Sequence, residues 1–193
     1  MGKVIQEAKP LVYPLPAFLI GANVDKKPNI MTAAWSGIAG SNPPMITVAL
    51  QHRRHTLKGI KQNMTFSVNV PSVDLVKETD YCGLISGDKS DKVEVCHFKI
   101  FYGKLETAPL IEQCPLNLEC KVLHILDLGS HALVVGRIEE EYISEDCLTD
   151  GRADINKIRP ILYVTTPRRY HVIGEAVGKA YTIGKELSGG DIT

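Results

Sequence analysis

Short runs of apolar residues alternate with turn-forming residues through the first part of the chain. The apolar runs cover residues 17–24, 30–36 and 45–51. Proline, glycine, asparagine and aspartate separate these runs, and the gaps are too short to hold helices. The pattern therefore predicts a meander of antiparallel strands at the start of the fold.

The next stretch predicts two short helices with a strand between them. Residues 56–63 begin with Thr56 as the expected N-cap and carry apolar residues three positions apart on one face. A strand is expected over residues 65–70, where a proline ends it. A second short helix is expected over residues 72–81, with Ser72 as its cap. Helices are thus expected to be a minor part of the fold.

Two long alternating segments dominate the second half. Apolar residues alternate with more polar ones over residues 116–126 and again over 132–142, and the turn between them, Asp127 to Ser130, contains a glycine. This arrangement predicts a β-hairpin. A further strand is expected at residues 161–164. Six or more strands with few helices predict an antiparallel β-barrel, because closure removes exposed sheet edges.

The composition fits one globular domain and disfavours two classes of partner. The 193 residues carry 22 Lys and Arg against 22 Asp and Glu, so the formal net charge is zero, and 44% of them are hydrophobic. A neutral chain has no global field that would recruit nucleic acid or an anionic membrane surface. Its apolar runs are far shorter than the roughly 20 residues of a membrane span. We therefore expect a soluble protein with a single domain over residues 1–193 and with neither nucleic acid nor membrane as a partner.

Cysteine and histidine spacing gives no sign of a metal centre. The five cysteines are odd in number and widely spaced, and no Cys-x-x-Cys pair occurs, which disfavours both a disulfide framework and a zinc ribbon. The N-terminus does not resemble a secretory signal. His52 and His55 are three apart, but two arginines lie between them and disfavour a divalent cation. These features predict a cytoplasmic protein without a metal site.

Candidate chemistry gathers instead in one short basic segment. The chain lacks the GxGxxG, Walker A and GxSxG motifs. The segment from His52 to Thr56 places two guanidinium groups, two imidazoles and a hydroxyl between a strand end and a helix start. Arginines and the free amides of a helix N-terminus favour a phosphate group. A solvated basic turn is the alternative interpretation, and a second loop, Ser86 to Lys92, allows the same two interpretations.

The only tryptophan, Trp35, lies among small residues. Ala33, Ala34, Ser36 and Gly37 surround it. Small side chains leave the backbone accessible to a flat aromatic ligand whose polar edge needs backbone partners. Packing of Trp35 inside the core is the alternative.

Six segments in order carry a resemblance to a known family. They are NIMTAAWSG at residues 29–37, NPP at 42–44, RRHT at 53–56, FSVNVP at 66–71, GLISGDKSDK at 83–92 and GSHALVVGRI at 129–138. In this order they resemble the flavin reductase-like family of FMN-binding split barrels, and the flavoredoxin branch in particular. The resemblance covers about residues 12–175 and leaves residues 176–193 as a C-terminal tail.

The resemblance implies a mainly β fold and a set of site residues. The implied fold is a six-stranded antiparallel Greek-key split β-barrel with a few short helices, assembled as a homodimer with FMN near the subunit interface. His131 is implied to lie near the flavin and the nicotinamide as the catalytic residue. The residues implied to bind FMN are Met31, Thr32, Ala33 and Trp35 at the ring, Arg53, Arg54, His55, Thr56, Ser86 and Lys92 at the phosphate, and Asn69 at the ribityl chain or ring.

The function implied by this resemblance is electron transfer through FMN, with NAD(P)H as the donor. FMN itself accepts hydride and releases single electrons, which explains why no nucleophile or metal motif is needed. One alternative is an FMN-binding electron-carrier module that a protein partner reduces, without NAD(P)H turnover. Another is a dimeric ligand-binding or sensor protein that keeps the barrel.

Overall fold

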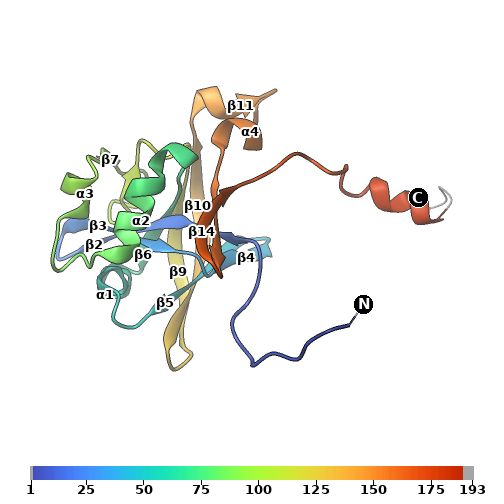
Figure 1. Ribbon diagram of the computed structural model, residues 1–193. Coiled ribbons are helices and arrows are strands. Elements are labelled where there is room, and N and C mark those ends of the chain that lie inside the picture. Colours follow the sequence, from blue (N-terminus) through green and yellow to red (C-terminus); the bar gives the residue numbers. More distant parts are fainter. Residues whose placement is uncertain (1, 189–193) are drawn as a thin grey trace.

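The computed structural model describes residues 2–188, and within them the main feature is one seven-stranded antiparallel sheet (Figure 1). The strands run in the spatial order β3-β2-β6-β9-β10-β5-β4. Their bounds are β2 (Phe18–Val24), β3 (Lys27–Ala33), β4 (Ser36–Ser41), β5 (Pro44–Gln51), β6 (Thr65–Val70), β9 (Leu116–Asp127) and β10 (His131–Ile143). Among the described residues the outer strands β3 and β4 do not pair with each other, so the barrel is split. The predicted fold class is confirmed, but the strand number of six was too low.

The additional strand is β4, which the sequence pattern did not separate from the strand before it. β4 pairs with β5 from Ser36 opposite Val48 to Ser41 opposite Pro44. Most of its residues are exposed, because it forms an outer edge of the sheet. Glycine and alanine have low strand propensity, so this edge shows no apolar alternation in the sequence.

The core of the barrel is formed by inward side chains of the main sheet. Ile20, Val48, Phe66 and Val134 have no exposed surface. Full burial of such a side chain contributes about 1.5–3 kcal/mol. A side chain at Gly136 would collide with the ring of Phe66, so β10 passes close to this ring only because it has a glycine there.

Helices cover the sheet at its edges. The α-helices are α1 (His55–Asn63), α2 (Val76–Leu84), α3 (Lys92–Val95) and α4 (Ile155–Ile158), and the 3₁₀-helices are η1 (Val73–Leu75), η2 (Glu145–Cys147) and η3 (Ile183–Ser188). The expectation that Thr56 caps α1 was wrong, since the N-cap is Arg54, whose backbone is extended (φ −71°, ψ 123°). Thr56 lies in the first turn and is buried. Ser72 caps η1 by accepting a hydrogen bond from the Asp74 amide, and α2 follows directly.

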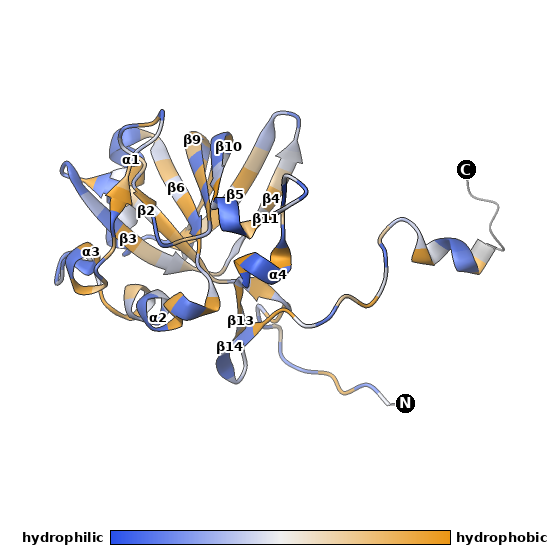
Figure 2. Cartoon of the chain, turned by 90° about the horizontal axis from the view of Figure 1, so that it is seen from above, coloured by the Kyte–Doolittle hydropathy of each residue, from blue (hydrophilic) through white to orange (hydrophobic). Residues whose placement is uncertain are grey.

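Three smaller sheets complete the described part of the chain. They are β1 (Leu15–Pro16) with β13 (Ile161–Thr165) and β14 (Arg168–Val172), β7 (Ile100–Phe101) with β8 (Leu110–Ile111), and β11 (Leu148–Thr149) with β12 (Arg152–Ala153). Beyond β14 the chain runs away from the barrel in both views (Figures 1 and 2). None of the described helices is long and apolar enough to cross a membrane.

Candidate functional site

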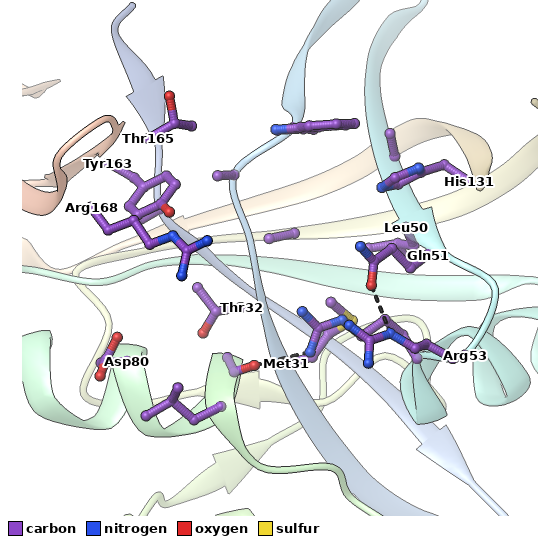
Figure 3. A pocket seen from close by; sticks show the side chains of 18 of the residues that line it. Met31, Thr32, Leu50, Gln51, Arg53, Asp80, His131, Tyr163, Thr165 and Arg168 are labelled. Atoms are coloured by element: carbon purple, nitrogen blue, oxygen red, sulfur yellow. Dashed lines mark hydrogen bonds between the residues drawn. The ribbon is translucent and has the colours of Figure 1, made fainter. Parts of the chain in front are cut away.

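A cavity of about 750 Å³ opens where β3 and β5 end. The end of α2 and the hairpin of β13 and β14 form its other walls (Figure 3). This volume lies within the roughly 300–1,000 Å³ of small-molecule pockets. Of the residues proposed from the sequence, it brings together Met31, Thr32, Ala33, Trp35, Arg53, Arg54 and His131.

Two aromatic rings stack at one wall of the cavity. The indole of Trp35 and the imidazole of His131 have centroids 4.7 Å apart and planes 22° apart. Trp35 is 39% exposed, so it does not pack in the core, which was the alternative interpretation of this residue. The side chain of Ser130 lies 2.8 Å from Nδ1 of His131. These rings and the small side chains of Ala33 and Ala34 give the cavity a flat, accessible wall.

Two cations mark the basic end of the cavity, Arg54 in its wall and Lys92 next to it. Arg54 is half-buried and donates a hydrogen bond of 2.9 Å to the carbonyl of Gly83. Lys92 is 3% exposed and donates to the carbonyl of Cys82 at 3.3 Å. Neither forms an ion pair with any residue that the structure describes. A half-buried and a buried positive charge without carboxylate partners are the arrangement expected where a bound anion supplies the missing charge.

The pKa values of these two cations report their surroundings. Burial lowers the pKa of Arg54, and the neighbouring charge of Arg53 lowers it further. Burial also lowers the pKa of Lys92; the charge of Arg54 adds to this effect, and the cysteine and aspartate groups nearby partly oppose it. The charge of Arg54 therefore acts on Lys92, although the two residues are 38 positions apart in the sequence. An anion bound between them would relieve both the repulsion and the desolvation.

Local structure explains how each cation reaches this end. The Arg54 amide bonds to the Gln51 carbonyl at 3.0 Å, and this turn carries the chain from β5 into α1. The first amides of a helix have no partners within it, so the start of α1 adds to the positive potential. Asp91 caps α3 by accepting bonds from the amides of Val93 and Glu94, and this fixes the backbone at Lys92.

Asn29 is a further residue near this end that the sequence did not reveal. It is buried, and its side-chain amide donates a hydrogen bond of 2.6 Å to the Thr56 hydroxyl. A side chain at Gly87 would collide with the Asn29 amide oxygen and lie 3.2 Å from the His55 ring. Glycine therefore allows the loop that contains Ser86 to approach the start of α1. The only sequence signal for Asn29 was its place at the head of the NIMTAAWSG segment.

His55, Thr56, Ser86 and Lys92 do not line the cavity, although they lie next to it. His55 and Thr56 begin α1 directly after Arg54, and Lys92 begins α3. Ser86 hydrogen-bonds Asp88 and holds the pKa of that carboxyl below its usual range. The structure therefore divides the predicted phosphate residues between the cavity wall and the neighbouring starts of α1 and α3 and the loop at Ser86.

The predicted contact of Asn69 with a ligand is not supported by its position. Asn69 has no exposed surface, and its amide nitrogen donates to the Leu19 carbonyl and to the Ser67 hydroxyl. Its oxygen accepts from the Ile111 amide and from the side chain of Asn117. All of its bonding groups are used within the core, so Asn69 joins β6 to β2, β8 and β9 and stays away from the cavity.

The hairpin of β13 and β14 forms a wall of the cavity that no sequence pattern predicted. Tyr163 and Tyr170 lie opposite each other in the pairing of the two strands, with ring centroids 5.7 Å apart. The Tyr170 hydroxyl donates to Asp80 of α2 at 2.9 Å, which joins the hairpin to the helix across the cavity. Burial raises the pKa of Tyr170, and the carboxylate of Asp80 raises it further. Because the contacts span 90 residues, no local pattern predicts them.

An aromatic wall beside unneutralised cations, on a split barrel, suits a flat ligand that carries an anionic group. A family model described as the flavin reductase like domain matches residues 11–174. The chain belongs to this family, and its fold and relatives support a flavin-binding redox function.

Three similar proteins show which members of the family this chain resembles. The flavoredoxin of Methanosarcina acetivorans is 41% identical, with a TM-score of 0.92 over 96% of this chain and 100% of the other. The flavoredoxin of Desulfovibrio vulgaris (Miyazaki F) is 36% identical, with a TM-score of 0.89 over the same shares. An uncharacterized protein of Archaeoglobus fulgidus is 37% identical over 145 residues, which are 75% of this chain and 81% of that protein.

Proposed function

We propose that this protein binds FMN and transfers electrons as a flavoprotein of the flavoredoxin type, with NAD(P)H as its electron donor. The observation that carries the proposal is a pair of cations without carboxylate partners at an open cavity of about 750 Å³, the half-buried Arg54 in its wall and the buried Lys92 next to it. A phosphate that carries close to two negative charges matches this pair. The aromatic and small-residue wall suits the flavin ring.

The residues present fit FMN at both of its ends. Arg54 and Lys92 hold the phosphate, with support from the N-terminus of α1. Thr56 is turned toward Asn29, so these two residues act as one polar unit behind the phosphate. When bound, FMN supplies hydride acceptance and one-electron release. The chain's own residues bind it, orient it and shape the entrance for the donor.

His131 is the residue we assign to the donor side. It lies at the mouth of the cavity, stacked on Trp35, with its Nδ1 beside Ser130. This contact fixes the plane of the imidazole, which leaves the ring available to a nicotinamide. A homodimer, with the flavin near the subunit interface, is part of the same proposal.

A second candidate function is an electron-carrier module that a protein partner reduces, without turnover of NAD(P)H. The observation that favours it is the similarity to two proteins named flavoredoxins, each covered over its full length. In both candidates the FMN site is the same, and they differ only in the donor.

One spectroscopic experiment tests both candidates. The purified protein is titrated with FMN and then mixed with NADH or NADPH without oxygen. We expect bound flavin, followed by bleaching of its visible absorbance faster than with free FMN. Flavin that binds but bleaches no faster than free FMN supports the carrier, whereas absence of FMN binding contradicts both.

A further inference from the structure

A further cation without an ion pair, Arg168, faces the cavity from the side opposite Arg53 (Figure 3). Arg168 is the first residue of β14, and its guanidinium points into the cavity from the hairpin (Figure 3). This guanidinium makes neither a hydrogen bond nor an ion pair with any residue between 2 and 188. A guanidinium directed into a cavity without a partner is suited to bind a carboxylate or phosphate by paired hydrogen bonds.

The strand pairing fixes which side chains share this wall. Thr165 lies opposite Arg168 and Tyr163 lies opposite Tyr170, and all four line the cavity. Successive side chains of a strand point to opposite faces, so Arg169 points away from it. The Thr165 hydroxyl is buried and has no hydrogen-bond partner in the described part of the chain. We call these four residues the hairpin face.

No acid in the cavity neutralises the hairpin face. Asp80 is the one carboxylate among the described lining residues, and it accepts a hydrogen bond from Tyr170. It forms no ion pair with Arg168. The cavity therefore has separate cationic groups at two ends, and a single phosphate group held at Arg54 and Lys92 leaves Arg168 without a counter-charge.

We propose that the hairpin face is a second anion subsite, which holds the phosphate or carboxylate group of the substrate that exchanges electrons with the flavin. This inference rests on the proposed function, because it assigns the FMN phosphate to the other end. Arg168 binds the anionic group, Thr165 donates its hydroxyl, and the ring of Tyr163 offers an aromatic surface beside them. The substrate class is thus a flat molecule that carries an anionic group.

A calorimetric titration tests this subsite with two anions that undergo no redox reaction. ADP-ribose represents a phosphate source and benzoate a carboxylate source, and each is titrated into FMN-loaded and FMN-free protein. Arg168→Gln removes the proposed contact, and Arg169→Gln removes the same charge from the next residue, which faces away. We expect Arg168→Gln to weaken binding of at least one probe about tenfold or more. Arg169→Gln should change it less than about twofold, and neither variant should alter FMN affinity.

Each outcome of the titration decides the question. If ADP-ribose binds and Arg168→Gln weakens its binding, the substrate carries a phosphate group. If benzoate binds in this Arg168-dependent way, the substrate carries a carboxylate group. The subsite is overturned if neither probe binds, if both variants weaken binding equally, or if Arg168→Gln weakens FMN binding instead. If the wild type takes up no FMN, the proposed function is wrong, and the titration of FMN-free protein still decides the subsite.

Discussion

Polar side chains are buried or half-buried in two regions of this molecule, and their hydrogen bonding differs. In the core, Asn69, Ser67 and Asn117 bond to one another and to backbone groups, so every group of Asn69 is used. At the basic end, Arg54 and Lys92 each bond to one carbonyl and lack a carboxylate in the described structure. Burial of a polar residue is thus no sign of a binding site, whereas burial without a matching partner is.

The two regions also differ in what they contribute to stability. A satisfied amide network joins strands and makes a net favourable contribution. A buried cation without a counter-ion destabilises the fold, because it loses hydration and gains no opposite charge. Such groups persist where function needs them, and a bound anionic ligand supplies the missing counter-charge and stabilises the fold.

The largest effect is expected from breaking the core network. Asn69→Ala leaves the Ile111 amide, the Asn117 side chain and the Leu19 carbonyl without their partner, and we expect the free energy of unfolding to fall by about 3 kcal/mol or more. Urea unfolding measures this change. Asn156→Ala is the control, because Asn156 is exposed and should shift stability by less than about 0.5 kcal/mol. If the folded variant also lost FMN affinity more than about twofold, the core would not be independent of the site.

The second effect concerns Arg54. Arg54→Gln removes a charge-assisted hydrogen bond to the phosphate, so we expect the Kd for FMN to rise about thirtyfold, which corresponds to roughly 2 kcal/mol. Flavin fluorescence during titration measures the Kd. Lys61→Gln removes a positive charge from the exposed end of the same helix and should leave the Kd within about twofold. Equal losses in the two variants would show that only the overall charge matters.

Lys92 is expected to give opposite effects on affinity and stability. Lys92→Met keeps the volume and removes the buried charge, so the FMN Kd should rise about tenfold. The melting temperature of the FMN-free protein should increase by about 2–4 °C, because an unpaired charge is no longer buried. Lys89→Met is the matched control in the same loop, where the lysine is exposed. A fall in the melting temperature of Lys92→Met would contradict the interpretation of Lys92 as an unpaired cation.

The smallest effect is the dependence of FMN affinity on pH. Burial lowers the pKa of Lys92, and Arg54 lowers it further, so the FMN-free protein loses this charge at a lower pH than an ordinary lysine would. Bound phosphate favours the protonated lysine. Between roughly pH 7.5 and 9.5, where the phosphate is already a dianion, the affinity should fall about threefold as pH rises. In Lys92→Met this decrease should disappear, and a decrease of the same size in both proteins would assign it to another group.

Much of the barrel was predictable from the sequence because its signals are local. The long hairpin around Asp127 to Ser130 and the buried stripe of α1 follow from periodicity over a few residues. β4 was missed because an exposed edge made of small residues shows no alternation. The N-cap was misplaced because Arg54 takes an extended backbone there without a side-chain cap, which no propensity indicates.

The residue types of the candidate site were predictable from the sequence, but which of these residues lie together in space was less so. The residue types around Arg54 indicated an anion site, and the resemblance implied Lys92 at the phosphate; the structure shows how Lys92, which lies far along the chain, comes close enough for the charge of Arg54 to act on it. Asn69 was misassigned because its motif does not distinguish a ligand contact from a core network. The hairpin face was missed, since the bond from Tyr170 to Asp80 arises only from tertiary packing.

The most direct test of the central claim compares FMN with riboflavin, which has the same ring but no phosphate. The dissociation constants of both are measured for the wild type and for the double variant Arg54→Gln with Lys92→Met. Wild-type protein is predicted to prefer FMN by about a hundredfold, a difference of roughly 2.7 kcal/mol, and the double variant should reduce this preference to about threefold. Equal affinity of the wild type for the two flavins, or an unchanged preference in the double variant, would contradict the claim that Arg54 and Lys92 hold the FMN phosphate.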